Sequence, residues 1–456
     1  MGIDVGWLLR HQKCSIRFPL HGSPKATRVK VAQVNFSDGK GGAARAAARL
    51  HLGLRATGVD SDMLVMERSG LIPHVERFIP SRQFRRRADR YLYRKRYGNE
   101  PLFFLPPSGF EIFSLDRCLW GADLIDQLEP YDLVNLHWIR GMFDYRAFFA
   151  AIAGQKPLVW TLHDMNPFTG GCHYDEKCGR FESQCGACPQ LQSSRENDLT
   201  RQIWNRKQQA FSNLADTQLT IITPSRWLAS ECRRSSLLGR FRVETIPYGL
   251  DLEQYQPRDP MVIRQLFDIP ESAFVVLALA DGFGARRKGF QFLTELIQQL
   301  HADTDIYFLL VGAAKADTAD EPRVRYLPSS PDDRYLSFVY SAADLFVMPS
   351  LADNLPNTIM ESIACGIPVV AFDVGGVPDM VRPGETGGLV PAEDVDGLAR
   401  EIRQLRDSSE LLHKMKQACR ITAEREFPLE LQGRRYGELY RRMMTENRDV
   451  SRCAAS

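Results

Sequence analysis

The chain has 456 residues, with 58 Lys and Arg against 56 Asp and Glu, so its formal net charge is only +2. This length exceeds one ordinary hydrophobic core and favours two domains of about 100 to 200 residues each. The balanced charge gives no overall field that would attract nucleic acid. No apolar run approaches the roughly 18 residues that a membrane span needs, and residues 1–27 lack the apolar stretch of a signal peptide. We therefore expect a soluble, cytoplasmic protein.

From residue 28 the sequence alternates short β-branched or aromatic runs with longer amphipathic stretches, which is typical of a parallel sheet with helical crossovers. The expected strands form two series, 28–36, 62–67, 132–138, 157–163 and 219–225, then 273–281, 306–312, 323–328, 344–350 and 367–373. Two such series predict an α/β protein with two doubly wound domains that face each other across a cleft. We expect an N-terminal extension (1–27), a first domain (28–243), a second domain (244–426) and a final helical segment (427–456) that packs back on the first domain.

Two features of the first series stand where open parallel sheets bind ligands. Gly41 and Gly42 lie between the first expected strand and an Ala-rich helix, where the backbone can approach an anion at the helix N-terminus. His163 ends the run PLVWTLH, and Asp164 follows it. Both features also have structural interpretations, because a glycine-rich turn is often only a turn and a lone histidine at a strand end is more often structural. His137 ends the neighbouring run in the same way, and we interpret it as structural.

A loop rich in cysteine, residues 170–190, follows His163. Its cysteines, Cys172, Cys178, Cys185 and Cys188, are separated by five, six and two residues. The last pair is a good two-point chelate, and four thiolates in a Gly-rich loop of a cytosolic chain favour structural zinc over disulfides. Two disulfides, free thiols and an iron–sulfur cluster stay open as alternatives, and His173 is a substitute ligand for one thiol. We expect such a centre to hold the loop in shape and to take no part in catalysis.

Residues 77–96 carry nine Lys or Arg and one Asp. On a helix their apolar residues would share one face with cations around it, as in an interfacial membrane helix. Arg85, Arg86, Arg87 and Arg90 would then contact anionic lipids. A solvated connecting helix is an equal alternative.

The stretch PSLADNLPNTIMESIACGIPVVAFDVGGVPDMV, residues 349–381, resembles the signature region of glycosyltransferase family 4, whose members are retaining enzymes of the GT-B fold. The family pattern has two Glu separated by seven residues, and Asp353 and Glu361 hold those places. Further matches are GGAARAAARLHLGLRATG, TPSRWLA, IPYGLDLEQYQP, RRKGFQFL and RPGETGGLVPAEDVDGLA, which together cover nearly all of 28–445 in the expected order. The resemblance implies a nucleoside-diphosphate sugar as the donor substrate.

The resemblance assigns most donor contacts to the second domain. By this resemblance, Glu361 binds the ribose diol, and a carboxylate suits a diol because it can accept two hydrogen bonds. Asp353 binds a hydroxyl of the donor sugar, although its side chain is one methylene shorter than the family's usual Glu. Without the surrounding pattern, we would interpret either carboxylate as a surface group near a helix N-terminus, where negative charge is favoured.

By the same resemblance, Lys288 would bind the leaving diphosphate. The family's usual Arg falls at Gly282 here, so Arg286 or Arg287 would replace it. The structural alternative for this basic triplet is a solvated turn. Backbone N–H groups near Asn354, Leu355 and Asn357 would face a phosphate at the start of a helix, with Pro356 as its first residue.

In the first domain the resemblance places His163 against the donor sugar near the reacting carbon, with Asp164 orienting it or meeting the acceptor. The family retains anomeric configuration, with the acceptor attacking on the face of the leaving group. This chemistry requires neither a pair of carboxylates nor a catalytic metal. Three Asp-x-Asp pairs, at 60/62, 303/305 and 394/396, read as loop residues, and we discount them as metal ligands.

The cysteine loop also resembles that of a bacterial branch of the family which builds exopolysaccharide and O-antigen repeats. This implies a glycan or lipid-linked oligosaccharide acceptor, a role in surface polysaccharide biosynthesis, and peripheral contact with the inner face of the plasma membrane. Two alternatives stay open. One is another GT-B nucleotide-sugar enzyme, such as an epimerase or hydrolase. The other is a binding protein whose transferase site has decayed, an interpretation that Asp353 and Gly282 support. A nucleic-acid module is disfavoured, because the flanks of the cysteines are not basic.

Overall fold

The computed structural model describes residues 29–79, 110, 112–118, 123–279, 286–312, 321–330 and 332–455, with side chains as far as residue 448. Residues 1–28 and most of the basic segment lie outside this set, including Arg85, Arg86, Arg87 and Arg90. Gly282 lies outside it as well. The expectations for the N-terminal extension and for membrane contact by the basic segment therefore stay predictions.

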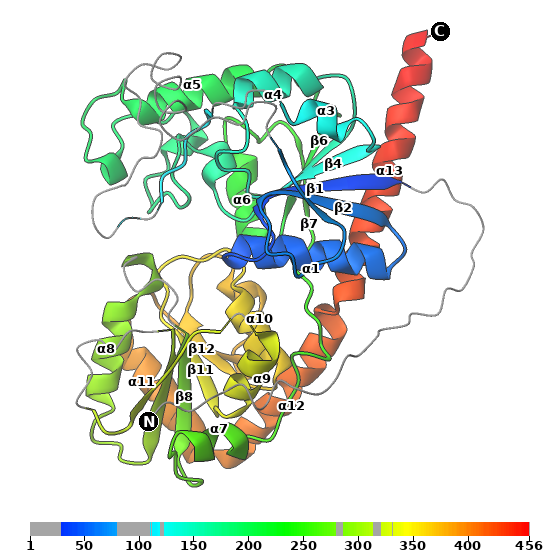
Figure 1. The fold of residues 1–456 in the computed structure, drawn as a ribbon. Coiled ribbons are helices and arrows are strands. Elements are labelled where there is room, and N and C mark those ends of the chain that lie inside the picture. Colours follow the sequence, from blue (N-terminus) through cyan, green and yellow to red (C-terminus); the bar gives the residue numbers. More distant parts are fainter. Residues whose placement is uncertain are drawn as a thin grey trace.

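The first half of the chain forms a seven-stranded parallel sheet in the order β3-β2-β1-β4-β5-β6-β7 (Figure 1). Its strands are β1 (Lys30–Ser37), β2 (Asp60–Glu67), β3 (Val75–Arg77), β4 (Leu133–Leu136), β5 (Leu158–Thr161), β6 (Leu219–Thr223) and β7 (Arg242–Thr245). Every residue of β4, β5 and β6 is buried. Helices cover both faces of such a sheet, so these strands are mainly continuous apolar runs without polar alternation.

The crossovers of this half include α1 (Gly42–Ala56), α3 (Ile125–Leu128), α4 (Tyr145–Ile152), α5 (Leu199–Phe211) and α6 (Arg226–Arg234). Aromatic rings join α4 and α5 to the sheet: Phe149 and Phe211 each pack against Trp160 of β5. Side-chain oxygens cap the N-termini of three of these helices. Asp144, Asp198 and Ser225 accept hydrogen bonds from backbone N–H groups in the first turns of α4, α5 and α6.

The second half forms a six-stranded parallel sheet in the order β10-β9-β8-β11-β12-β13. Its strands are β8 (Phe274–Leu279), β9 (Ile306–Val311), β10 (Val324–Leu327), β11 (Leu345–Met348), β12 (Val369–Phe372) and β13 (Gly387–Val390). Its helices are α7 (Met261–Leu266), α8 (Phe290–Gln299), α9 (Asp333–Ser341), α10 (Asn357–Ala364), α11 (Val395–Asp407) and α12 (Ser409–Glu426). Two apolar clusters, one on each face, hold this sheet between its helices.

The last helix, α13 (Leu429–Ala455), runs from the second half along the first half and lies against α1 (Figure 1). Its buried tyrosines attach it to the first sheet: the Tyr436 hydroxyl lies 3.0 Å from Thr161 Oγ1, and Tyr440 accepts a hydrogen bond from Asn135 at 3.1 Å.

The two doubly wound sheets confirm the expected α/β architecture. The sequence did not predict the edge strands β3, β7 and β13, and the limit expected at residue 243 falls inside β7. Edge strands are short and partly solvated, so they lack the apolar run that marks a central strand. In β7, RVET, all four residues are at least partly exposed.

Candidate active site

A cavity of about 130 Å³ lies at the carboxyl ends of β8, β9 and β11, the edge where open parallel sheets bind ligands. Lys288, Ser350, Thr358 and Glu361 line it from the second half, and Arg45 reaches it from α1. In Figure 1, α1 lies between the two halves, next to the end of α10. Residues from both halves therefore enclose this cavity.

Glu361 is a buried carboxylate in the lining of the cavity. Its side chain is 1% exposed, and Oε1 accepts a hydrogen bond of 2.7 Å from Nη2 of Arg49, whose side chain is 9% exposed. Oε2 accepts from the Tyr340 hydroxyl at 3.1 Å. Burial works against the charge of Arg49, but the neighbouring Glu361 raises the Arg49 pKa above its ordinary value. This ion pair joins α1 of the first half to α10 of the second.

A second cation of α1 extends this contact. Arg45 pairs with Asp333 of α9, lies 3.7 Å from Glu361 and donates to the Tyr255 hydroxyl at 2.9 Å. We did not predict roles for Arg45, Arg49, Asp333 or Tyr255 from the sequence. The available signal was the spacing of the two arginines, four residues apart on one face of an Ala-rich helix.

Asp353 lies beside two of the predicted diphosphate contacts. Its Oδ2 accepts from Lys288 Nζ at 2.8 Å and from Arg287 Nη1 at 3.2 Å, and its Oδ1 accepts from the backbone N–H of Asn354 at 3.0 Å. Burial alone would raise the pKa of Asp353, but Lys288 and Arg287 hold it below its ordinary value. Of the two arginines predicted to replace the family's Arg, Arg287 is directed at this carboxylate, whereas Arg286 is exposed.

The turn before α10 meets the first half of the chain through polar side chains. Asn354 accepts a hydrogen bond from Ser225 at 2.6 Å and donates one to the backbone oxygen of His163 at 3.0 Å. Asn357 donates to the backbone oxygen of Gly42 at 3.0 Å. Gly41 has a φ of 88° at the start of α1, a conformation that favours glycine. Asn357 thus lies against the predicted glycine turn, and Asn354 lies against the backbone at His163.

One detail of this turn differs from its prediction. Pro356 precedes the first helical residue, Asn357, as an N-cap, where the sequence predicted it at the first position. Both positions suit the fixed φ of proline. The observed start of α10 is therefore one residue later than the predicted start. The side chain of Leu355 is 4% exposed and packs in the core of the second half, so any donor contact at this residue is made by its backbone.

His163 follows β5 and stacks between two rings, those of His137 and Tyr248. Its Nε2 lies 3.1 Å from His137 Nδ1, and its Nδ1 lies 2.6 Å from the Tyr248 hydroxyl. Because Gln33 Oε1 faces His137 Nε2 at 2.9 Å, we assign that nitrogen as the donor, which makes His137 Nδ1 an acceptor for His163. Burial lowers the pKa of His163 to about 4, so the ring is neutral at pH 7.

Both ring nitrogens of His163 thus have protein partners, and a donor sugar must replace one of them to hydrogen-bond the ring. Asp164 does not contact this ring through a hydrogen bond: its Oδ2 lies 2.6 Å from His173 Nδ1 and 3.1 Å from Trp138 Nε1. His173 Nε2 lies 2.7 Å from Ser114 Oγ. Because both of its nitrogens are engaged, His173 is not placed to substitute for a cysteine ligand.

Two family models match the chain. Residues 40–254 match the model described as Glycosyltransferase Family 4, and residues 274–408 match the one described as Glycosyl transferases group 1. The D-inositol 3-phosphate glycosyltransferase 1 of Catenulispora acidiphila is 34% identical over 328 residues, which span 66% of this chain and 71% of that protein. The chain belongs to glycosyltransferase family 4. The MMP alpha-(1->4)-mannosyltransferase of Mycolicibacterium hassiacum is also similar, at 26% identity over 43% of this chain and 47% of that protein.

Solved structures support the same fold. The sucrose-phosphate synthase of Thermosynechococcus elongatus superposes with a TM-score of 0.61 at 20% identity, covering 92% of this chain and all of that one. HepE of Anabaena, solved with UDP and glucose, gives a TM-score of 0.62 at 18% identity, covering 90% of this chain and 99% of that one. At these identities the likeness establishes the fold alone. The predicted GT-B fold is confirmed.

The long loop between β5 and α5 in this family 4 glycosyltransferase has little regular structure. It contains only the 3₁₀ turns η2 (Asn166–Phe168), η3 (Arg180–Glu182) and η4 (Pro189–Leu191). Its packing is nevertheless dense, since Phe168 and Phe181 are buried and their ring centroids lie 5.5 Å apart. The chain is packed so closely here that a Cβ atom added at Gly186 would lie only 2.4 Å from the backbone oxygen of Glu196.

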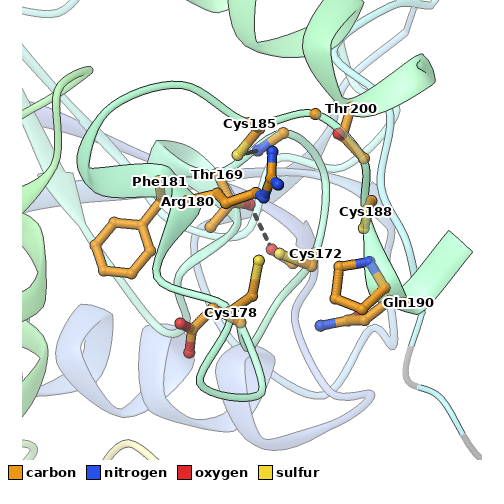
Figure 2. A pocket seen from close by; sticks show the side chains of 13 residues that line it. Thr169, Cys172, Cys178, Arg180, Phe181, Cys185, Cys188, Gln190 and Thr200 are labelled. Atoms are coloured by element: carbon orange, nitrogen blue, oxygen red, sulfur yellow. Dashed lines mark hydrogen bonds between the residues drawn. The ribbon is translucent and has the colours of Figure 1, made fainter. Parts of the chain in front are cut away.

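The four cysteines of this loop surround one cavity of about 20 Å³ (Figure 2). Each carries a free thiol, and Cys185 and Cys188 are buried. Burial raises the pKa of Cys185 to about 11 and that of Cys172 well above its ordinary value. Within the described residues, no three His, Cys, Asp or Glu side chains stand together as an assembled metal site.

The Asp-x-Asp pairs predicted as loop residues have structural partners, but Asp60 and Asp62 lie in β2 and not in a loop, with Asp62 accepting from the Tyr131 hydroxyl at 3.2 Å. Asp303 accepts hydrogen bonds from Arg403 and Arg406, and Asp394 caps α11 by accepting from the backbone N–H of Gly397.

Across the described part of the chain, no helix has the length and apolar character to span a membrane.

Proposed function

We propose that this family 4 glycosyltransferase moves a sugar from a UDP-sugar to a glycan acceptor, with retention of anomeric configuration. The observation that carries this proposal is the 130 Å³ cavity, which Glu361 and Lys288 both line, while Arg287 lies beside Lys288 on the Asp353 carboxylate. A carboxylate for a ribose diol and cations for a diphosphate are the groups that a nucleoside-diphosphate sugar requires. Complexes of HepE with UDP and with UDP-glucose support a uridine donor.

In this proposal Glu361 binds the ribose without losing its own partners. Arg49 and Tyr340 each use one acceptor position of the carboxylate, and a carboxylate has about four such positions. Each oxygen thus keeps a lone pair for one ribose hydroxyl. The Arg49 contact also makes donor binding depend on closure of the two halves, because Arg49 comes from α1.

The diphosphate would draw Lys288 away from Asp353. The Lys288 side chain is 38% exposed and flexible, so its ammonium can turn toward a phosphate in the cavity. Asp353 would then keep Arg287 and accept a hydroxyl of the donor sugar. As the bond from the anomeric carbon to the diphosphate breaks, Lys288, Arg287 and the backbone N–H groups near Asn354, Leu355 and Asn357 stabilise the charge that develops on the leaving oxygen.

His163 and the turn at Gly41 and Gly42 would form the other wall of the site. A hydroxyl of the donor sugar would displace Tyr248 from His163 Nδ1, which accepts a hydrogen bond in the neutral ring. The acceptor hydroxyl attacks the anomeric carbon from the face of the leaving group, and its proton passes to the departing diphosphate oxygen. No residue of the site has to form a covalent intermediate, and no catalytic metal takes part.

We further propose that the first half of the chain, as far as the end of β7, forms the acceptor-side domain and the second half the donor-side domain. The acceptor would be a lipid-linked oligosaccharide of surface polysaccharide assembly, reached at the inner face of the plasma membrane. The basic segment 77–96 would provide the membrane contact. Liposome sedimentation tests this: binding to anionic vesicles should fall with salt and with replacement of Arg85, Arg86, Arg87 and Arg90 by Gln, and salt-insensitive binding would exclude it.

Product analysis tests the transferase proposal. The purified protein is incubated with UDP-sugars and a lipid extract, and the products are examined by NMR spectroscopy for their anomeric configuration. An α-linked product from an α-linked donor supports retaining transfer. Release of free sugar without acceptor indicates a hydrolase, and an isomerised UDP-sugar indicates an epimerase. Nucleotide binding without any product would indicate a binding protein.

A further inference from the structure

We propose that Cys172, Cys178, Cys185 and Cys188 bind one structural Zn²⁺ ion that fixes the loop between β5 and α5. The four side chains reach one small cavity from separate parts of the loop (Figure 2). Four cysteine sulfurs are a complete ligand set for tetrahedral zinc, with no position left for water or substrate. A closed set of this kind has a structural role.

A backbone donor already points at one of the four sulfurs. The N–H of Gly170 donates to Cys185 Sγ at 3.2 Å. Hydrogen bonds to a charged acceptor are the strong kind, so this donor favours a metal-bound thiolate. The neutral sulfur of a disulfide would gain little from it.

A buried cation lies next to the cluster. Lys207 is fully buried, and its ammonium donates to the backbone oxygens of Asn166 at 2.5 Å and Thr169 at 3.0 Å. Cys172 and Cys185 lie near enough to act on its charge. Zinc with four thiolates carries a net charge of −2, and a buried ammonium at this place offsets part of it.

The loop has little regular structure for an ion to compete with. Residues 162–198 contain three short 3₁₀ turns and no longer element, and irregular loops of this length within a compact domain are usually functional. An ion would join four points of the loop at once. One of them, Cys172, precedes His173, which holds Asp164 beside His163. Another, Cys188, is tied by its backbone N–H to Asp198 at the start of α5.

The cavity fits one ion and no larger ligand. Its volume of about 20 Å³ is close to the space that one water molecule occupies. Among the described residues the four sulfurs do not form an assembled metal site, so metal binding requires the cysteine side chains to move toward one another until each lies about 2.3 Å from the ion. Each thiol gives its proton to solvent as its sulfur binds the ion, and no oxidant is involved.

The test is the metal content and thiol count of the full chain as purified without chelator. Elemental analysis should find about one zinc per chain, and denaturation with EDTA and alkylating agent, without reductant, should label all ten cysteines. Two disulfides would leave only 10 − 4 = 6 cysteines labelled and would overturn the proposal. Ten labelled cysteines without zinc, or iron in place of zinc, would overturn it as well.

A variant locates the ion. Cys185→Ser with Cys188→Ser should lower the zinc content at least about tenfold, because two of four ligands are lost. Cys232→Ser is the matched control, since Cys232 is a buried cysteine of α6 outside the cluster and should leave the zinc content unchanged. If the double variant does not fold, Co²⁺ exchange into the unaltered protein decides the ligand set. Tetrahedral thiolate coordination gives intense sulfur-to-cobalt absorption, and its absence would contradict the proposal.

Discussion

Replacement of Arg49 by Ala should destabilise the protein far more than loss of a typical surface charge. The Arg49–Glu361 bond is 2.7 Å long, and the two side chains are 9% and 1% exposed. Removing one partner of a buried pair leaves an uncompensated charge and typically costs about 3 to 5 kcal/mol of the free energy of unfolding. Glu361 keeps the Tyr340 hydrogen bond and still has the Arg45 guanidinium at 3.7 Å. These contacts together offset about 1 kcal/mol of this, so we expect a loss of about 2 to 4 kcal/mol for Arg49→Ala.

The assay is urea denaturation, followed by tryptophan fluorescence and circular dichroism, in a double-mutant cycle with Glu361→Ala. Removal of both residues leaves no unpaired buried charge, so the double variant should lose less stability than the sum of the single variants, by at least about 1 kcal/mol. Lys40→Ala is the control, because Lys40 and Glu67 form a pair of 3.0 Å with side chains 83% and 47% exposed. That change should cost at most about 1 kcal/mol. An Arg49→Ala loss no larger than the control's, or strictly additive losses in the cycle, would refute the reasoning.

Three further predictions concern neighbouring residues. Lys288→Ala should weaken UDP binding by about 2 to 3 kcal/mol in calorimetry, whereas exposed Arg286→Ala should change it by less than about 0.5 kcal/mol; equal losses would contradict the assignment. Because the folded-state pKa of His163, about 4, lies below its unfolded value, its contribution to stability is complete above about pH 6.5 and is lost as pH falls toward 4. His163→Asn should therefore flatten the pH dependence of unfolding in that window by up to about 3 kcal/mol, and an unchanged profile would rule this out. Gly289→Ala should cost more than about 2 kcal/mol of stability, since the added Cβ would lie 1.8 Å from the Pro349 oxygen at a φ of 69°. Gly58→Ala, with φ of 83° and open space, should cost about 1 kcal/mol, and similar losses for the two would argue against the clash.

The fold could be predicted from the sequence because a buried parallel strand leaves an apolar run of its own length. The runs before His137 and His163 are β4 and β5, and both fall at the centre of the first sheet. The residues at strand ends could be located for the same reason, since parallel strands bring their carboxyl ends to one edge. The edge strand β7 has no such run and was missed.

Side-chain partners could not be predicted in the same way, because they join residues far apart in the chain. Arg49 and Glu361 are 312 positions apart, and each is unremarkable within its own helix. For His163, the position at a strand end could be predicted from the sequence. Its ring partners, His137 and Tyr248, could not, because they come from two other segments of the chain. Sequence patterns locate elements, whereas charge pairs across a cleft depend on how the halves meet.

Calorimetric titration of UDP into the wild-type protein and Glu361→Ala tests the central claim most directly. Circular dichroism first establishes that the variant is folded, and Glu67→Ala, an exposed carboxylate of the first sheet, serves as the control. The proposed ribose contact predicts that UDP binds the wild-type and control proteins, with an affinity about 2 to 3 kcal/mol weaker in Glu361→Ala. Equal affinity for UDP in all three proteins, or no binding to the wild type, would contradict the assignment of this cavity as the donor site.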